Sequence, residues 1–190
     1  MNRIASRRPE TLEFSESAES SVYQRGLADR VEGACALEAL EKQLFWLCEL
    51  ASHLSTEQVD KIHLPYHWTI RQVFEHCADA ERVFGYRMLR IAAGDPTPLP
   101  SWDENAYADS RFGLGTFTNL VNEVAMLRQS NLLLLRRIEP KAWDRSVKVN
   151  GNRMTVRAIA WVTAGHLHHH FEIVEARCGM TVQRAPAPNM

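Results

Sequence analysis

Four stretches of the chain carry apolar residues at the three- and four-residue spacing of an amphipathic helix. In the first stretch, from about residue 35 to residue 54, the apolar positions are Leu37, Leu40, Leu44, Leu47, Ala51 and Leu54. The other three stretches cover about residues 70–93, 116–138 and 155–178. Four long amphipathic helices in one chain predict an all-α fold, a four-helix bundle.

The second and fourth helices have clear signals at their ends. Thr69 is followed three residues later by Gln72, which is the pattern of an N-terminal capping box. Gly94, followed by an Asp-Pro pair, predicts the end of the same helix. The fourth helix is expected to begin at Thr155 and to end before Gly179.

The connections on either side of the third helix differ in kind. Residues 95–115 contain three prolines and then Trp102 and Tyr107, without a clear period. Connections of that length are usually functional or held against the domain, so we expect residues 96–107 to form a lid over the bundle. Before the fourth helix, apolar and polar residues alternate around Asn150-Gly151, which predicts a short two-stranded hairpin.

Composition and charge place this bundle among ordinary globular domains. Hydrophobic residues make up 45% of the 190 residues and charged residues 24%, enough for one domain with a full core. A net charge of -1 offers no basic surface to a nucleic acid or a membrane. No apolar run is long enough to span a bilayer or to act as a signal peptide, so we expect a cytoplasmic protein.

The two ends of the chain are expected to lie outside the bundle. Residues 1 to about 30 are rich in Ser, Glu and Arg without a sustained period, which predicts a flexible arm that ends in a short helix near residues 23–31. Residues 181–190 are expected to form a tail. The cysteines are far apart and form no CxxC pair, so we expect free thiols, with Cys77 in the core.

The fourth helix carries four histidines within five residues, in the sequence GHLHHHFEIV. Residues four apart lie one turn above each other, so His166 and His170 present two imidazoles to one point in space. His168 falls on the opposite side and is expected to face water. Two ligands hold a first-row metal poorly, and His76, which lies among apolar residues on the second helix, is the candidate for a third.

Three imidazoles with an open coordination position suit zinc, nickel, iron(II) or copper by ligand type, and we expect zinc or nickel ahead of iron. The open position would accept water or a thiol, and the metal would lower the pKa of either. Asp79, one turn from His76, is a candidate for orienting a ligand or for acting as a base. Glu81 is expected to be solvated or paired with Arg82 or Arg87. Glu172 and Glu175 flank the histidines with the same alternatives.

Other interpretations of the histidines stay open. An HxxxH pair also occurs where histidines are exposed or hydrogen-bonded on a helix surface. A bound metal could instead join the second and fourth helices of a non-enzymatic, stress-related bundle that acts through a protein partner. In a third interpretation the histidines are ordinary, and the bundle core binds an apolar ligand.

Two segments, HWTIRQVFEHCADAERVFGYRMLRIAAGDPTPLP and GNRMTVRAIAWVTAGHLHHHFEIV, resemble the DinB-like, YfiT-like family of small bacterial four-helix bundles. The resemblance rests on the Trp-Thr helix start, on the histidine followed by ADAE, and on the GHxxHH run, and it extends from about residue 37 to residue 179. It implies a DinB-like bundle domain over residues 31–180. It also implies a homodimer and a metal held by three histidines, at the positions of His76, His166 and His170.

The same resemblance implies an activity. Better understood branches of the family look like S-transferases or isomerases that use a low-molecular-weight thiol, and others look like metal-dependent hydrolases. This chain lacks the second domain of the mycothiol-dependent isomerases, and Leu167-His168 replaces the acidic and apolar pair expected there. We therefore expect a metal-dependent enzyme that activates a small thiol or water against a small-molecule substrate, with neither nucleic acid nor membrane as a partner.

Overall fold

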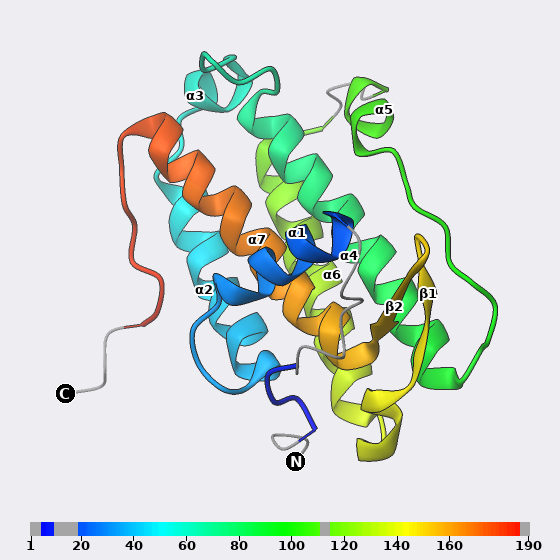
Figure 1. Cartoon of the computed structure of the whole chain (residues 1–190). Helices are drawn as coiled ribbons and strands as arrows, with labels where there is room; N and C mark the ends of the chain where they lie inside the picture. The colour runs from blue at the N-terminus through cyan, green and yellow to red at the C-terminus, as the bar shows by residue number, and fades with distance from the viewer. Residues whose placement is uncertain (1–4, 10–18, 111–114, 187–190) are drawn as a thin grey trace.

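The computed structural model describes residues 5–9, 19–110 and 115–186, and over these residues the chain is mostly helical. Its four longest helices are α2 (Ala36–Ser52), α4 (Ile70–Ala93), α6 (Phe117–Arg137) and α7 (Val156–Cys178). They pack side by side as a bundle in which α7 contacts both α2 and α4 (Figure 1). The predicted all-α four-helix bundle is confirmed. No helix in the described parts of the chain is long and apolar enough to cross a membrane.

The helix ends follow from the capping residues that the sequence predicts. The Thr69 side chain accepts a hydrogen bond from the Gln72 backbone N–H, and the Thr69 backbone N–H donates to the Gln72 side chain at 2.9 Å. Gly94 ends α4 with a φ of 80°, and Gly179 ends α7 with a φ of 62°, a conformation that costs glycine little. Both helices therefore begin and end where the pattern predicts.

Short elements fill the connections between the bundle helices. They are α3 (Thr56–Asp60) after α2, α5 (Glu104–Asp109) after α4, and the 3-10 helix η2 (Pro140–Asp144) after α6. The strands β1 (Ser146–Val149) and β2 (Asn152–Thr155) pair antiparallel. Asn150 and Gly151 join them with positive φ angles, which confirms the predicted hairpin.

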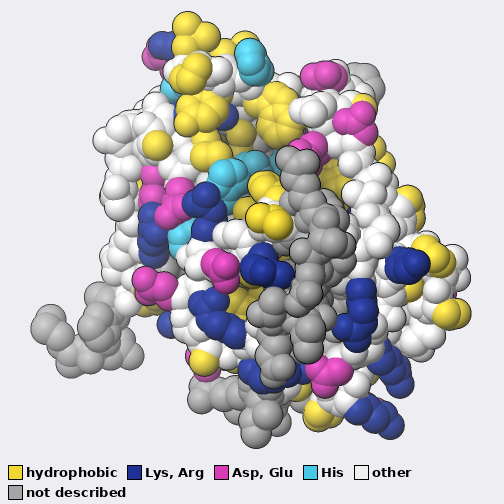
Figure 2. All heavy atoms as spheres, viewed as in Figure 1, with side chains coloured by type: hydrophobic (Ala, Val, Ile, Leu, Met, Phe, Trp, Pro, Cys, Tyr) yellow, Lys and Arg dark blue, Asp and Glu magenta, His cyan; other side chains and the backbone are white. Residues whose placement is uncertain are grey.

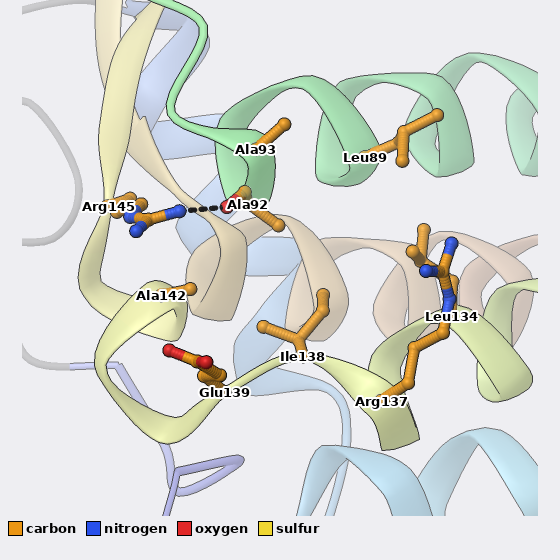
Figure 3. Close-up of a pocket in the computed structure, with 9 residues that line it drawn as sticks. All are labelled: Leu89, Ala92, Ala93, Leu134, Arg137, Ile138, Glu139, Ala142 and Arg145. Atoms are coloured by element: carbon orange, nitrogen blue, oxygen red, sulfur yellow. Dashed lines mark hydrogen bonds between the residues drawn. The ribbon is translucent and has the colours of Figure 1, made fainter.

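Both long connections are attached to the bundle. The Leu99 backbone N–H donates to the Lys148 carbonyl at 2.9 Å, so the connection after α4 lies along the hairpin. Figure 3 shows Arg145, at the end of η2, donating to the Ala92 carbonyl near the end of α4.

The N-terminal arm packs more closely than its composition predicts. Helix α1 (Glu19–Asp29) lies across α7 (Figure 1). The Ser6 carbonyl accepts from the Ala36 backbone N–H at 3.0 Å, and the Arg7 carbonyl accepts from Trp161 Nε1 at 2.8 Å. The expectation of a loose arm is therefore not met in residues 5–9 and 19–29, because buried side chains and backbone hydrogen bonds hold them. Residues 1–4 and 10–18 of the arm lie outside the described residues.

The C-terminal tail is also partly attached. The Val182 backbone N–H donates to Glu175 Oε1 at 3.1 Å, and Arg184 pairs with Glu175 at 2.9 Å. The thiols of the four cysteines are free, and Cys77 is buried in the core as predicted.

We expect Gly165→Ala to lower the free energy of unfolding by about 1–3 kcal/mol, as an overpacked contact does. A Cβ atom at Gly165 would lie 2.0 Å from the Leu27 carbonyl oxygen, so α1 would have to move away from α7. Urea unfolding and limited proteolysis of α1 measure the effect. Gly26→Ala is the matched control, since a Cβ at Gly26 meets nothing within 4 Å. Equal stability of the two variants would contradict the close approach of α1.

Candidate metal centre

Two bundle helices bring the three predicted histidines together. His76 comes from α4, and His166 and His170 lie one turn apart on α7. The Nε2 atom of His166 lies 2.8 Å from that of His76 and 3.2 Å from that of His170. His76 and His166 are 4% and 6% exposed, whereas His170 is partly exposed. One nitrogen from each ring lies within 4.8 Å of the other two, so the cluster could hold a metal ion.

The surroundings keep the α7 imidazoles of this cluster neutral. Burial lowers the pKa of His166 well below its usual range, and the neighbouring imidazoles of His170 and His76 lower it further. Burial and the His76 imidazole lower the pKa of His170 in the same direction. Neutral imidazole is the form that binds a metal, so these side chains are ready as ligands at neutral pH.

The donor set fits a metal better than it fits hydrogen bonding among the rings. His166 Nε2 faces two other nitrogens, but a neutral ring nitrogen has either one proton or one lone pair to share. An ion about 2.0–2.1 Å from each imidazole nitrogen places neighbouring nitrogens roughly 2.9–3.4 Å apart, at right angles or at the tetrahedral angle. The two nitrogen–nitrogen distances at His166, 2.8 and 3.2 Å, are therefore close to those of a metal ligand set.

Aromatic side chains enclose the cluster. The Trp102 ring stacks on His76 with 5.4 Å between centroids and 5° between planes, and Trp68 lies 5.2 Å from the same imidazole. Phe84 meets His166 edge-on at 5.5 Å. Trp102 belongs to the connection predicted to be a lid, and Tyr107 packs against it at 5.3 Å. In Figure 2, histidine side chains gather near the middle of one face, beside hydrophobic side chains.

A pocket of about 160 Å³ opens beside His166. Its walls come from α1, the lid, the hairpin, α4 and α7, and they consist of Tyr23, Gln24, Leu27, Phe84, Arg87, Ser101, Trp102, Glu104, Val149, Asn150, Val162 and His166. The larger hollow in Figure 3, about 320 Å³ near the end of α4, contains none of the three histidines. The small pocket thus reaches the cluster at His166.

The layout of the bundle core explains why polar groups gather at this level. One cluster of buried apolar side chains surrounds the hairpin end of the bundle, and a second surrounds the end near α3. Between them lie buried polar side chains from all four bundle helices, namely Gln43, Glu81, Arg128, Asn131 and Thr163. We call these five residues the polar layer.

Two predicted positions of charged and polar side chains are corrected. Glu81 is 3% exposed and pairs with Arg128 of α6 at 2.5 Å, rather than with solvent, Arg82 or Arg87. His168 is only partly exposed to water, since its side chain is 17% exposed and lies edge-on to Trp46 at 5.0 Å. Arg128 beside Glu81 and Trp46 beside His168 both come from another helix, which the spacing along one helix cannot reveal.

The remaining acidic candidates lie in different surroundings. Asp79 forms an ion pair with Arg82 at 3.8 Å and lines a pocket between α4 and α6 that contains none of the histidines. Glu172 lies 3.1 Å from His168, and Glu175 accepts from Trp46 Nε1 at 3.1 Å. The sequence reasoning missed Phe84 and Arg87 as pocket residues. Phe84 lies eight residues after His76 in the same helix, and this spacing could have predicted that both side chains lie on the core-facing side.

Comparison with known proteins agrees with this architecture. Residues 37–174 match the model of the DinB superfamily. The fold is similar to that of YfiT from Bacillus subtilis, a probable metal-dependent hydrolase with an unusual four-helix bundle topology. The two chains are 18% identical with a TM-score of 0.64, over 93% of this chain and 99% of that chain. A sequence comparison with curated proteins gives no significant match. Since the family model matches most of its length, the chain belongs to the DinB superfamily.

Proposed function

We propose that this protein is a metal-dependent enzyme whose divalent ion is held by His76, His166 and His170. The observation that carries the proposal is the meeting of three buried or partly buried imidazoles beside a pocket. Closed structural zinc sites have four protein ligands, whereas catalytic sites keep a position open. The candidate ligand group found among the described residues has three members.

The proposed reaction is the attack of water or of a low-molecular-weight thiol on a small electrophilic substrate. A bound divalent ion would act as a Lewis acid and lower the pKa of the water or thiol beside it. The description of YfiT as a probable metal-dependent hydrolase supports the hydrolytic version. We propose zinc or nickel as the ion, and iron(II) after them.

The chain's own residues would prepare this reaction. Phe84 and Trp102 form apolar walls around the imidazoles, which limits the water that reaches them. His166 borders the pocket directly, so a substrate there would lie beside the cluster. Asp79 is the candidate for orienting a ligand, and its ion pair with Arg82 supports a structural role instead.

A purely structural metal is the competing function, and the core of the bundle argues against it. The polar layer and the two apolar clusters already join α2, α4, α6 and α7 without an ion. If the ion were structural, the free energy of metal binding would supply the free energy of folding, and the apoprotein would unfold. A catalytic ion leaves the bundle folded when it is removed.

We therefore expect chelation to abolish activity while the helical signal in circular dichroism persists. The apoprotein would be reloaded with zinc, nickel or iron(II), the last without oxygen. Each form would then be assayed on a panel of esters and amides and on thiols with electrophiles. Activity that returns with one metal supports the proposal. Unfolding on chelation would favour a structural metal. The absence of turnover on both panels with every metal would contradict the proposal that the protein is an enzyme.

A further inference from the structure

Arg87 carries a buried positive charge without a carboxylate partner in the described parts of the chain. It is 8% exposed and donates from NH2 to the Pro100 carbonyl at 2.8 Å. The other two buried arginines of the described residues do have partners, because Arg128 pairs with Glu81 and Arg157 pairs with Asp144. Burial of an unpaired guanidinium costs free energy, so its retention calls for an explanation.

Among the described residues, no carboxylate pairs with Arg87. Burial lowers the pKa of Arg87. For comparison, the carboxylate of Asp60 raises the pKa of Arg71 through a hydrogen bond. Arg87 therefore lacks a carboxylate partner among the described residues.

Arg87 lines the same pocket as His166. Leu27, Phe84, Val149 and Val162 supply apolar walls there. Gln24 also lines the pocket, and its side-chain oxygen is buried without a hydrogen-bond partner among the described residues. A pocket with a cationic side chain between apolar walls is typical of a small-molecule site.

We propose that this pocket binds the carboxylate of a small organic acid on Arg87. The planar guanidinium donates pairs of parallel hydrogen bonds that match a carboxylate. Glu104, an acidic residue on the pocket wall, repels any anion there, and it repels a doubly charged phosphate more than a singly charged carboxylate. The inference names the class of substrate for the proposed metal-dependent reaction, and in that respect it rests on the proposed function. Binding at Arg87 can be measured without turnover.

The probes are acetate, butyrate and phenylacetate, with their uncharged amides and inorganic phosphate for comparison. Binding would be followed by NMR titration of the full chain, both metal-loaded and metal-free, which separates binding at Arg87 from binding at the ion. We expect at least one carboxylate to bind the metal-free protein, with the amides and phosphate at least tenfold weaker. Preference for the amide or for phosphate overturns the inference.

The variants test the residue itself. Arg87→Gln should weaken carboxylate binding at least tenfold, and Arg87→Lys should weaken it less because the charge remains. Arg82→Gln is the matched control, five residues earlier on α4 with a 48% exposed side chain, and should leave binding unchanged. The ligand-free Arg87→Met protein should melt no lower than the parent, because an unpaired buried charge is removed. Equal carboxylate binding by the parent and Arg87→Gln would overturn the inference.

The two proposals fail in different ways. If carboxylates bind in a way that depends on Arg87 but no metal-dependent reaction is found, the proposal of a carboxylate site holds and the proposal of an enzyme fails. If a metal-dependent reaction is equally fast on neutral and anionic substrates and unchanged in Arg87→Gln, the proposal of an enzyme holds and the proposal of a carboxylate site fails.

Discussion

Replacement of His76, His166 or His170 by alanine is expected to lower the affinity for the divalent ion by more than 100-fold. Loss of a residue that only orients a metal ligand typically costs 10–100-fold, and these side chains are proposed as the ligands themselves. Each variant leaves two imidazoles, which hold a first-row metal poorly. Because the three nitrogens lie within 4.8 Å of one another, we expect each of the three variants to lose metal affinity.

Elemental analysis of the untagged protein and a competition titration with a chromophoric chelator measure this loss. The parent should bind about one ion per chain, since three imidazoles make one ligand set. His168→Ala is the matched control on α7, since its imidazole packs against Trp46 outside the cluster. Full metal content in His76→Ala would show that the ion lies on α7 alone, contrary to the proposal. Loss of metal in His168→Ala to the same extent would assign the ion to another set of histidines.

The extent to which this cluster follows from the sequence depends on periodicity. His166 and His170 are four apart, and His76 lies among apolar residues on its own helix, so each face could be predicted independently. Both faces point to the core, and the helices that carry them contact each other. The lid was expected from its prolines and aromatics. Its contact with His76 through Trp102 depends on the path of the chain, which no local pattern specifies.

Features that depend on partners from distant parts of the chain could not be predicted in this way. The composition of the arm gives no sign that α1 packs on α7, and Gly165 alone marks the close approach. Glu81 looked like a surface residue because helix spacing relates it only to its neighbours on α4. Its actual partners, Arg128 and Asn131, come from α6. Pairing of polar groups between helices is a property of the assembled bundle.

The largest effect on stability is expected from this polar layer. Arg128→Met should lower the free energy of unfolding by about 3–5 kcal/mol, because Glu81 would be left as a buried charge without a cation. The Arg128 guanidinium donates to Glu81 Oε1 at 2.9 and 2.5 Å and to Gln43 Oε1 at 2.5 Å, and it is 1% exposed. One side chain thus joins α6 to both α4 and α2.

Urea unfolding followed by circular dichroism measures this loss, and the exposed pair Arg82 with Glu123 serves as the control. Those side chains are 48% and 42% exposed and 2.5 Å apart, and exposed pairs contribute about 0–1 kcal/mol. Arg82→Ala should therefore cost little. A cost for Arg128→Met no larger than that for Arg82→Ala would show that Glu81 finds water or another partner, and that the polar layer does not hold the bundle.

The double variant Glu81→Leu with Arg128→Met separates the attraction between the two charges from the free-energy cost of burying them. Replacing a buried ion pair by apolar groups is often neutral or stabilising, so the double variant should regain most of the stability that Arg128→Met loses. Its metal affinity then becomes informative, because Glu81 and His76 share α4 while Arg128 reaches the Thr163 carbonyl of α7 at 3.5 Å. A stable double variant with weakened metal binding would show that the polar layer sets the spacing of α4 and α7 on which the three histidines depend. Unchanged metal binding would assign that spacing to the apolar clusters on either side.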